Sequence, residues 1–423
     1  MSVKMKNKLV SGLALTFTLG SFNALATNGY FTHGYGMTHK GMAGAGVALS
    51  EELMSGANNP ASFNVNDTEI SVGLELFSPD RKYTASSVGT FYPNALYLEA
   101  KTQKSDNTLF AIPEFAIGHQ LNDKINIGLL VYGNGGMNTG YNAESEPEGT
   151  FYAGTTGVDL KQMFISPTIN YQLNEQTKVG VSPIYVVQQF KATGLGNFAP
   201  FSQSPQALTN NGTDTSTGLG VQVGITQTVG TSFSWGASYR SSVSMDEFDS
   251  YKGLFAENGG FDLPSSIQIG AAYMLTPTNQ VVFDWQKINY SEVKSIANPM
   301  SNLMSAPLGA SAGAGFGWKD MDIYKLGYQW QRTAKQKIRF GVSYTQQPIP
   351  SSEVLFNILA PGVQEWHFTT GFSHKVSEKV QLNAMAFYSP AKKVSGANFL
   401  APNQQLSIEM QQSGVGVSIV WGI

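Results

Sequence analysis

Residues 162–173, QMFISPTINYQL, alternate apolar and polar side chains almost without a break. The apolar set is Met163, Ile165, Ile169, Tyr171 and Leu173, and the polar set is Gln162, Ser166, Thr168, Asn170 and Gln172. Successive side chains of a β-strand point to opposite faces, so a strand here has one apolar and one polar surface. The stretch therefore predicts a strand that separates an apolar from a polar environment.

The same rhythm returns along most of the chain. Fourteen strand-like segments begin near Asp67, Thr108, Asp123, Gly157, Gln176, Thr215, Thr231, Asp262, Asn279, Lys319, Gln336, Val363, Glu378 and Ser407. Their links alternate in length. Short polar turns are expected at 122–123, 174–175, 230–231, 277–278, 334–335 and 377–378. Long loops are expected at 80–107, 134–156, 192–214, 248–261, 295–318, 347–362 and 392–406. Strict alternation of short and long links is typical of an up-and-down barrel and has no reason to occur in a sandwich.

The composition indicates where such a barrel would reside. Charged residues are 13% of the chain, against about 25% in soluble proteins, and there is no cysteine. Lys4, Lys6 and Lys8 precede the apolar stretch 9–19, and Ala24-Leu25-Ala26 supplies a small-residue cleavage site. This is the pattern of a signal peptide. We therefore predict an all-β, 14-stranded antiparallel transmembrane barrel in the bacterial outer membrane, crossing it many times.

Other classes of protein fit the sequence less well. Without a basic run, nucleic acid is not an expected partner. The five histidines form no metal-ligand spacing, and no Gly-x-Ser-x-Gly motif is present, so we expect no catalytic residue, metal or cofactor. A general diffusion porin remains an alternative, and an outer-membrane lipase is a weaker one. We expect a monomer surrounded by outer-membrane lipid and lipopolysaccharide.

The stretch between the signal peptide and the first strand has no strand rhythm. It includes GMAGAGVALSEELMSGANNPA, in which small residues allow short helices to pack closely. Pro60 would end a helix, and the amides of Asn58 and Asn59 suit polar anchorage. A barrel of fourteen strands leaves a hole unless something fills it. We expect residues 1–26 to be the signal peptide, 27–66 a helical hatch in the lumen, and 67–423 the barrel; an ordinary turn before the first strand is the alternative.

This stretch resembles the N-terminal hatch of the FadL/TodX family of outer-membrane transporters for long-chain fatty acids and aromatic hydrocarbons. The family's Asn-Pro-Ala motif corresponds to Asn59, Pro60 and Ala61. The later stretches FDLPSSIQIGAAY, GFGWKDMDIYKLGYQW and RFGVSYTQQPIPSS also resemble family segments, in the same order. The resemblance runs from about Gly29 to the C-terminus.

The resemblance implies a transport function. Family members capture an apolar ligand in the outer loops, pass it into the barrel, and release it sideways through the wall when the hatch moves. The expected partner is therefore a hydrophobic small molecule, with long-chain fatty acids first and uncharged aromatic or aliphatic hydrocarbons as the alternative.

Glycines interrupt the third strand in the region of the family's wall kink. Gly133, Asn134, Gly135 and Gly136 follow a strand that alternates well up to Val131. Glycines weaken a strand and permit a bulge, so we expect a lateral opening here, unless these residues only begin an outer loop. Pro113, Pro167 and Pro183 also lie inside predicted strands, where bulges or kinks are expected.

Two outer loops carry more apolar residues than solvated loops need. We expect substrate contacts from Leu195, Phe198, Phe201, Leu208, Tyr251, Leu254, Phe255 and Phe261. Lys191 and Lys294 stand close to where family members place basic ligand contacts, and either could bind a carboxylate. The alternative is that both lysines face lipopolysaccharide. Val187 and Gln188 stand where an inward arginine is expected in fatty-acid transporters, which weakens the case for a fatty acid and leaves room for an uncharged hydrocarbon.

Overall fold

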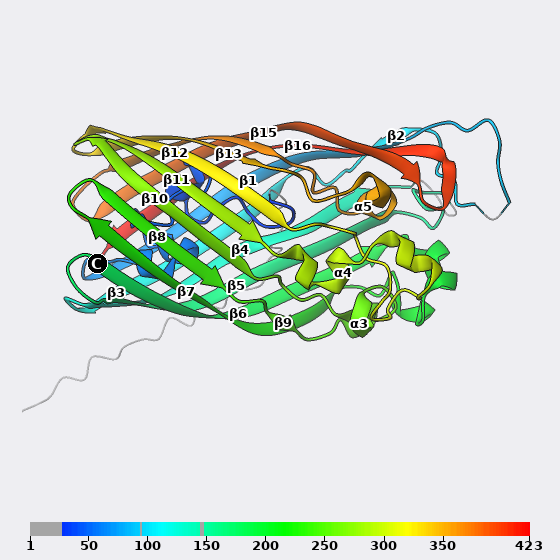
Figure 1. Cartoon of the computed structure of the whole chain (residues 1–423), viewed down its shortest axis with the longest axis horizontal. Coiled ribbons are helices and arrows are strands. Elements are labelled where there is room, and N and C mark those ends of the chain that lie inside the picture. Colours follow the sequence, from blue (N-terminus) through cyan, green and yellow to red (C-terminus); the bar gives the residue numbers. More distant parts are fainter. Residues whose placement is uncertain (1–27, 94, 144–147) are drawn as a thin grey trace, which may run out of the picture.

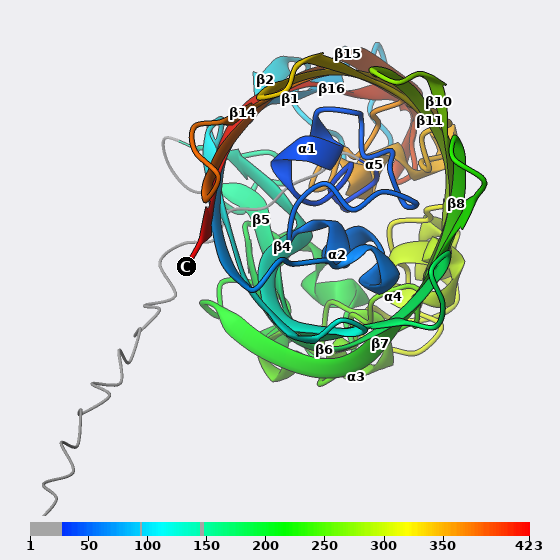
Figure 2. The same cartoon turned by 90° about the vertical axis from the view of Figure 1, so that its left-hand side faces the viewer.

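The computed structural model describes residues 28–93, 95–143 and 148–423, so the predicted signal peptide lies outside the described residues. Fourteen long antiparallel strands form one closed sheet, which Figures 1 and 2 show as a barrel. The strands are β1 (Thr68–Ala85), β3 (Phe110–Asn122), β4 (Ile125–Tyr141), β5 (Thr156–Gln172), β6 (Thr177–Thr193), β7 (Asp214–Val229), β8 (Phe233–Arg240), β10 (Ser266–Thr276), β11 (Asn279–Ile288), β12 (Met321–Thr333), β13 (Gln336–Thr345), β14 (Trp366–Lys375), β15 (Val380–Asn398) and β16 (Ala401–Gly422).

The sheet closes because the first and last strands pair. The β1–β16 register runs from Glu69↔Gly422 to Ala85↔Leu406. Two short strands, β2 (Thr102–Lys104) and β9 (Ser244–Met245), pair with β1 and β7 from within the loops. The fourteen-stranded barrel is thus confirmed.

The alternation of the sequence separates the two faces of the wall. On β16, Val415, Val417, Ile419 and Trp421 are exposed, while Ser418 is buried. Exposed apolar residues recur on the outward face of most strands, as a lipid-facing surface requires. Among the described residues, no helix has the length and apolar character needed to cross a membrane.

The connections follow the predicted alternation with one exception. All six short turns lie where they were expected, and six of the seven long links are long. The seventh long loop, 392–406, is wrong: β15 and β16 continue through it and are joined only by Phe399 and Leu400. This segment is polar because it extends beyond the apolar part of the wall. Above that level a strand needs no lipid-facing apolar side chains, and it therefore resembles a loop in sequence.

Two of the three strand prolines lie opposite each other. The β5–β6 pairing runs to Ile165↔Tyr185 and resumes at Ile169↔Val181, so Pro167 and Pro183 meet in the interval. Neither has an N–H to donate, so the ladder is interrupted there. We call this the proline interruption. Pro113 follows the same logic, since β3–β4 pairing ends beside it at Glu114↔Tyr132.

Residues 28–66, which we call the hatch, lie inside the barrel, where Figure 2 shows them in the bore. Their elements are α1 (Met37–Lys40), α2 (Ser55–Asn58) and the 3₁₀ turn η1 (Pro60–Ser62). The helices are single turns, so the expected helical character is minor and most of the hatch is turn and coil. Nearly all of its residues are buried.

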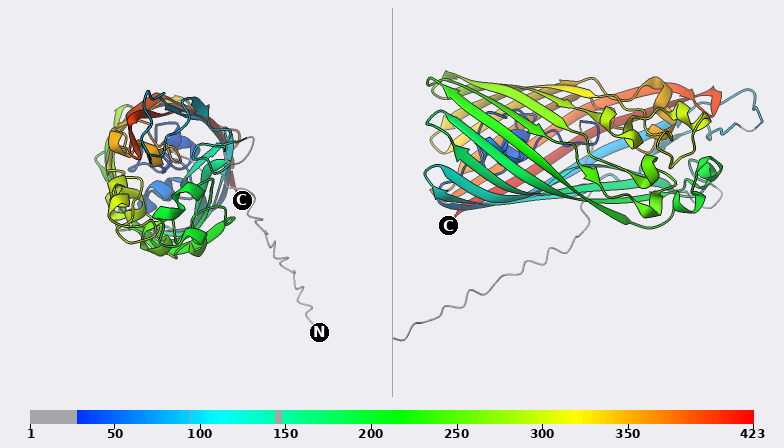
Figure 3. Two further views of the ribbon diagram at one scale, coloured as in Figure 1. Left: turned by 90° about the vertical axis from the view of Figure 1, so that its right-hand side faces the viewer. Right: turned by 60° about the horizontal axis from the view of Figure 1, so that its bottom comes forward.

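Short helices gather in the long loops, at the end of the barrel away from the C-terminus (Figure 3). These are η2 (Gly196–Phe201), η3 (Pro205–Ala207), η4 (Asp249–Tyr251), α3 (Ala256–Gly259), η5 (Tyr290–Glu292), α4 (Lys294–Ala297), η6 (Met300–Met304), η7 (Ser351–Glu353) and α5 (Val354–Asn357). Because long loops lie outside the cell in barrels of this kind, we treat this end as the outer end.

Candidate functional site

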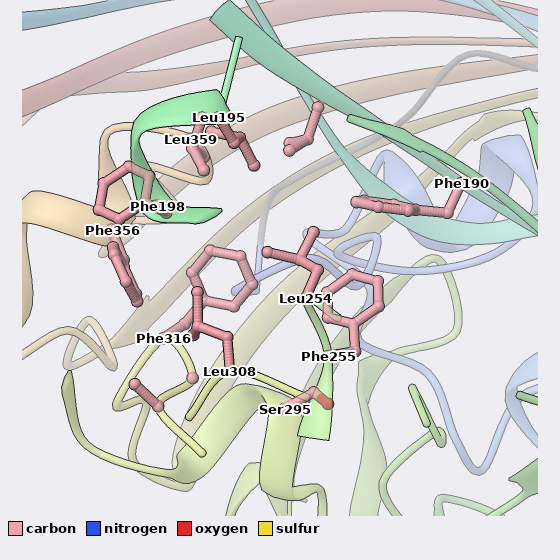
Figure 4. A pocket seen from close by; sticks show the side chains of 13 residues that line it. Phe190, Leu195, Phe198, Leu254, Phe255, Ser295, Leu308, Phe316, Phe356 and Leu359 are labelled. Carbon is pink, nitrogen blue, oxygen red and sulfur yellow. The ribbon is translucent and has the colours of Figure 1, made fainter. Parts of the chain in front are cut away.

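An apolar cavity lies beneath the outer loops (Figure 4). Its volume is about 40 Å³. The walls come from two strands and four loops: Val158 and Phe190 from β5 and β6, then Leu195, Phe198, Leu254, Phe255, Ser295, Leu308, Ala314, Gly315, Phe316, Phe356 and Leu359. Ser295 supplies the one side-chain hydroxyl, and no lining residue is charged. The chemistry of this lining suits an apolar ligand.

Aromatic side chains hold the loops around this cavity. Phe190 of β6 packs on Phe255 with ring centroids 4.6 Å apart, and Phe198 packs on Phe356 at 5.4 Å. Both pairs join residues far apart in sequence, so the cavity forms only when the loops fold against one another. Tilted and edge-on ring pairs of this kind stabilise such a cluster beyond their buried area.

The predicted substrate residues divide into three groups. Leu195, Phe198, Leu254 and Phe255 line the cavity. Leu208, Tyr251 and Phe261 are buried in the surrounding cluster without lining it, and Phe201 packs against that cluster. The role of all eight in binding stays a prediction.

The two predicted lysines lie elsewhere. Lys191 points outward from β6, since its neighbours Phe190 and Ala192 are the buried ones. Lys294 is exposed, and its Nζ lies 2.6 Å from Oε1 of Glu257. Neither lysine reaches the cavity, so neither offers a free cation to a ligand held there.

Several lining residues were missed by the sequence. Phe190 is an inward strand residue. Phe316 and Phe356 belong to two loops for which the sequence analysis predicted no substrate contact. The apolar residues of those two loops gave the same signal as the loops that were chosen. Which of them meet at one place depends on how the loops fold.

The Asn-Pro-Ala motif joins the hatch to the wall. The Asn59 side chain accepts a hydrogen bond from Ala61 N at 2.9 Å and donates to Val47 O at 2.8 Å and Ile225 O at 3.2 Å. Pro60 lies so close to Gly180 of β6 that a Cβ there would be 2.2 Å from its carbonyl carbon. The motif therefore ends α2 and fixes the hatch against β6 and β7.

Ion pairs hold the hatch on the opposite side of the bore. Glu51 Oε2 lies 2.7 Å from Lys337 Nζ and 2.8 Å from Arg339 Nη2, both on β13. Burial would raise the pKa of the Glu51 carboxyl, but these two cations outweigh it and hold the pKa well below its usual value. Lys40 of α1 pairs with Glu75 of β1. Breaking a buried pair is costly, so these contacts favour a seated hatch.

The glycines of β4 lie at a second interruption of the wall. The alternative that they begin a loop is wrong, because β4 continues to Tyr141, and the register with β5 shifts at Gly133/Gly135 as in a β-bulge. On the other side of β4, pairing with β3 ends at Glu114↔Tyr132 and backbone contact resumes only where Asp106 N donates to Gly140 O at 2.8 Å. We call this the glycine interruption.

The start of the hatch occupies the glycine interruption. Thr32 N donates to Asn134 O at 3.0 Å, and Gly136 N donates to Tyr30 O at 2.9 Å. Phe31 forms an isolated bridge with Gly135. Hatch backbone thus takes the place of β3 along the free edge of β4.

Aromatic rings connect the cavity to this point. Phe255 lines the cavity and lies 4.8 Å from Phe261, which lies 6.1 Å from Tyr30. Tyr30 also packs on Tyr290, whose hydroxyl donates to Asn28 O at 2.6 Å. The hatch residues at the wall are therefore the next layer below the cavity.

A buried arginine also contacts the glycine interruption, and the sequence analysis did not predict it. Arg240, the last residue of β8, donates to the Tyr35 hydroxyl and to Asn134 Oδ1, each at 3.0 Å. Its guanidinium also lies over the rings of Phe31 and Phe164, at 4.8 and 5.1 Å. The resemblance to fatty-acid transporters implied an inward arginine on β6, whereas this buried arginine is on β8. Its hydrogen bonds hold Asn134 and the hatch together.

The described residues contain no group of three or more His, Asp or Glu placed to hold a metal ion.

The family model described as outer membrane protein transport protein (OMPP1/FadL/TodX) matches residues 18–420. A long-chain fatty acid transport protein of Escherichia coli O6:H1 is 23% identical over 92% of this chain and 92% of its own length.

Solved structures share the fold. The toluene transporter TodX of Pseudomonas putida superposes with a TM-score of 0.68 at 15% identity, covering 93% of this chain and 99% of its own. A FadL homologue of Pseudomonas aeruginosa gives 0.70 at 13% identity, with the same coverage. The TbuX toluene transporter of Ralstonia pickettii gives 0.63 at 15%, covering 92% and 98%. Because the family model spans almost the whole chain, the protein belongs to the OMPP1/FadL/TodX family of outer membrane transport proteins.

Proposed function

We propose that this protein takes up hydrophobic compounds through the outer membrane and releases them sideways through the wall. The observation that carries the proposal is the alignment of three features: the apolar cavity, the aromatic layer from Phe255 to Tyr30, and the glycine interruption. Hatch residues 30–32 stand between the cavity and the wall, so their displacement would free a path.

Lateral release suits such a ligand for a thermodynamic reason. An acyl chain gains about 0.8 kcal/mol per CH₂ by leaving water for an apolar medium. A route through an aqueous bore would forfeit this gain, whereas a route from cavity to lipid keeps it. The seated hatch also argues against a diffusion porin, because its buried residues occupy the bore.

The chemistry of the cavity favours an uncharged hydrocarbon over a fatty acid. No cation lines the cavity, Lys294 is paired with Glu257, and Arg240 is committed to Tyr35 and Asn134. A carboxylate in this space would lose its hydration without an ionic partner. The first expectation from the sequence, long-chain fatty acids, therefore becomes the second candidate, supported by the name of the Escherichia coli relative.

Uptake by a strain lacking the gene tests the proposal. Labelled toluene and labelled oleate should enter faster when the gene is restored, and toluene should show the larger increase. Phe190→Ala with Phe255→Ala should reduce toluene uptake about tenfold, because two rings leave the cavity wall. Phe368→Ala, an exposed outward phenylalanine, serves as the control.

One outcome would change the proposed substrate, and another would contradict the whole proposal. Oleate uptake without toluene uptake would reverse the order of substrates while keeping the route. Steady, large conductance of the purified protein in planar bilayers would show an open bore and contradict the proposal as a whole.

A further inference from the structure

A polar hollow lies on the outer surface of the wall near the glycine interruption. It has a volume of about 810 Å³ and extends across β4, β5 and β6 near their outer ends. Its residues include Asn138 and Gly140 of β4, Asp159 and Lys161 of β5, and Lys191 of β6. It shares one lining residue, Val158, with the apolar cavity, and its other lining residues are different.

The charged side chains of the hollow face outward, whereas the buried residues Phe110, Thr139 and Val158 border it from the lumen side. On β5, Leu160 and Phe164 are buried in the lumen, so Asp159 and Lys161 lie on the other face. Toward the middle of β5, the next residue on the outward face is Met163. Toward the middle of β6, the residues on the outward face after Lys191 are Gln189 and Val187. The hollow thus begins where the apolar outer surface ends, at the level of lipid headgroups.

Two strand residues in the lining are glycines, and the Asn107 side chain lies over one of them, Gly140. Gly140 pairs with Gly157, and both lie in the lining. Beside them, Asn107 Nδ2 donates to Asn138 Oδ1 at 2.8 Å, and Asn138 Nδ2 donates to Asp159 Oδ1 at 2.9 Å. These hydrogen bonds hold the amides in place before any ligand arrives.

The charges of the hollow favour an anion. Lys161 Nζ lies 2.8 Å from Asp159 Oδ2, so that pair is balanced. Lys191 faces Asp159 across the strands, but within the described residues no ion pair is recorded for it. Among the described residues, the lining therefore carries two lysines against one aspartate, in a chain whose formal net charge is −3.

We propose that this hollow binds the phosphorylated sugar headgroup of an outer-leaflet glycolipid, with Lys191 and Lys161 on the phosphate. The amides suit sugar hydroxyls, and lysine is a common phosphate-binding residue. The acyl chains would then lie over Met163 and the apolar wall below. Leu109 and Phe110 also border the hollow, next to the glycine interruption, so the bound lipid would stand at the mouth of the proposed exit. The inference does not depend on which hydrophobic compound is transported.

Native mass spectrometry of the purified full chain with added lipid A tests this site. Lys161→Gln/Lys191→Gln should lower the lipid A-bound fraction about tenfold, because two charge-assisted contacts are lost. The control is Lys82→Gln/Lys104→Gln, two lysines at the same end of the barrel that pair with Glu409 and Asp80 and lie outside the hollow. The control should bind lipid A as the wild type does.

Two further arms identify the ligand chemistry. Dephosphorylated lipid A should bind weakly to the wild type and both variants alike, and oleate binding should be the same in all three. Thr193→Trp, which fills the hollow without changing its charge, should reduce lipid A binding as the lysine variant does. Undiminished lipid A binding by the lysine variant would overturn the proposal, as would an equal loss in the control or a selective loss of oleate.

Discussion

The barrel wall is interrupted at two places, and they differ in kind. At the glycine interruption, between β3 and β4, one strand loses its partner, since β3 begins only at Phe110 and its pairing with β4 stops at Glu114. At the proline interruption, between β5 and β6, both strands continue and only the hydrogen bonds are missing.

The two interruptions are also closed by different groups. Hatch backbone fills the first, through Tyr30 and Thr32. Side-chain hydroxyls bridge the second, where Thr168 Oγ1 and Ser182 Oγ lie 2.7 Å apart behind the two prolines. The difference indicates that missing donors alone do not create a movable opening. A strand held on both sides of a gap stays in place, whereas an edge paired with a displaceable segment can be uncovered.

Disulfides across each interruption should separate them most sharply. The chain has no cysteine, so Ile112→Cys/Gly133→Cys and Thr168→Cys/Ser182→Cys each introduce one possible bond. A Cβ on Gly133 would lie 3.3 Å from Ile112 Cγ2, which is within reach of a bridge. Oxidation of the first pair should reduce uptake to the level of a strain lacking the gene, and reductant should restore it.

The second pair is the matched control, because it crosses the wall where no exit is proposed. Uptake by its oxidised form should equal that of the wild type. If the Thr168→Cys/Ser182→Cys bond stops uptake and the other does not, the assignment of the exit is wrong.

Substitution of Gly135 should detach the hatch from the wall with a smaller effect. A Cβ at Gly135 would lie 1.8 Å from Tyr30 O, so Gly135→Val cannot keep the Tyr30 and Thr32 backbone bonds. Amide hydrogen exchange at Thr32 and Gly136 should rise about tenfold or more, as expected for the loss of one or two hydrogen bonds.

Gly89→Val is the control for this variant, since nothing lies within 4 Å of a Cβ at that loop position. Unfolding of the barrel should be unchanged in both. Unaltered exchange in Gly135→Val would mean that the hatch does not close the glycine interruption.

Restoring donors at the proline interruption should have the smallest effect. Pro167→Val/Pro183→Val supplies two N–H groups to a ladder whose register is already correct on both sides. Each restored bond should add about 1 kcal/mol to the free energy of unfolding, measured in urea. Uptake should stay at the wild-type level, and a loss of uptake would indicate that this interruption takes part in transport.

Much of the candidate site followed from local patterns in the sequence. The Asn-Pro-Ala motif and the glycines of β4 both mark real features, because a proline or a run of glycines acts on the backbone at its own position. Leu195, Phe198, Leu254 and Phe255 were found for a similar reason, as apolar residues in loops. Phe316 and Phe356 were not predicted, because the local sequence does not indicate which loops contact one another.

The lysines show what a local pattern leaves open. The buried neighbours of Lys191 follow from the alternation along β6, which could have indicated its outward direction. Its position beside Lys161 and the two paired glycines could not, since that depends on the register of three strands. Lys294 similarly forms an ion pair with Glu257, which belongs to a different loop.

By itself the sequence determined the number of strands, the two faces of the wall, all six short turns, six of the seven long loops, and the presence of a separate segment before the first strand. These follow from periodicity and turn residues, which act over a few positions. The tertiary structure decided where the wall is interrupted, which loops enclose the cavity, and which cations are free. Those depend on contacts between residues from different strands and loops, such as Tyr30 with Tyr290 and Thr32 with Asn134.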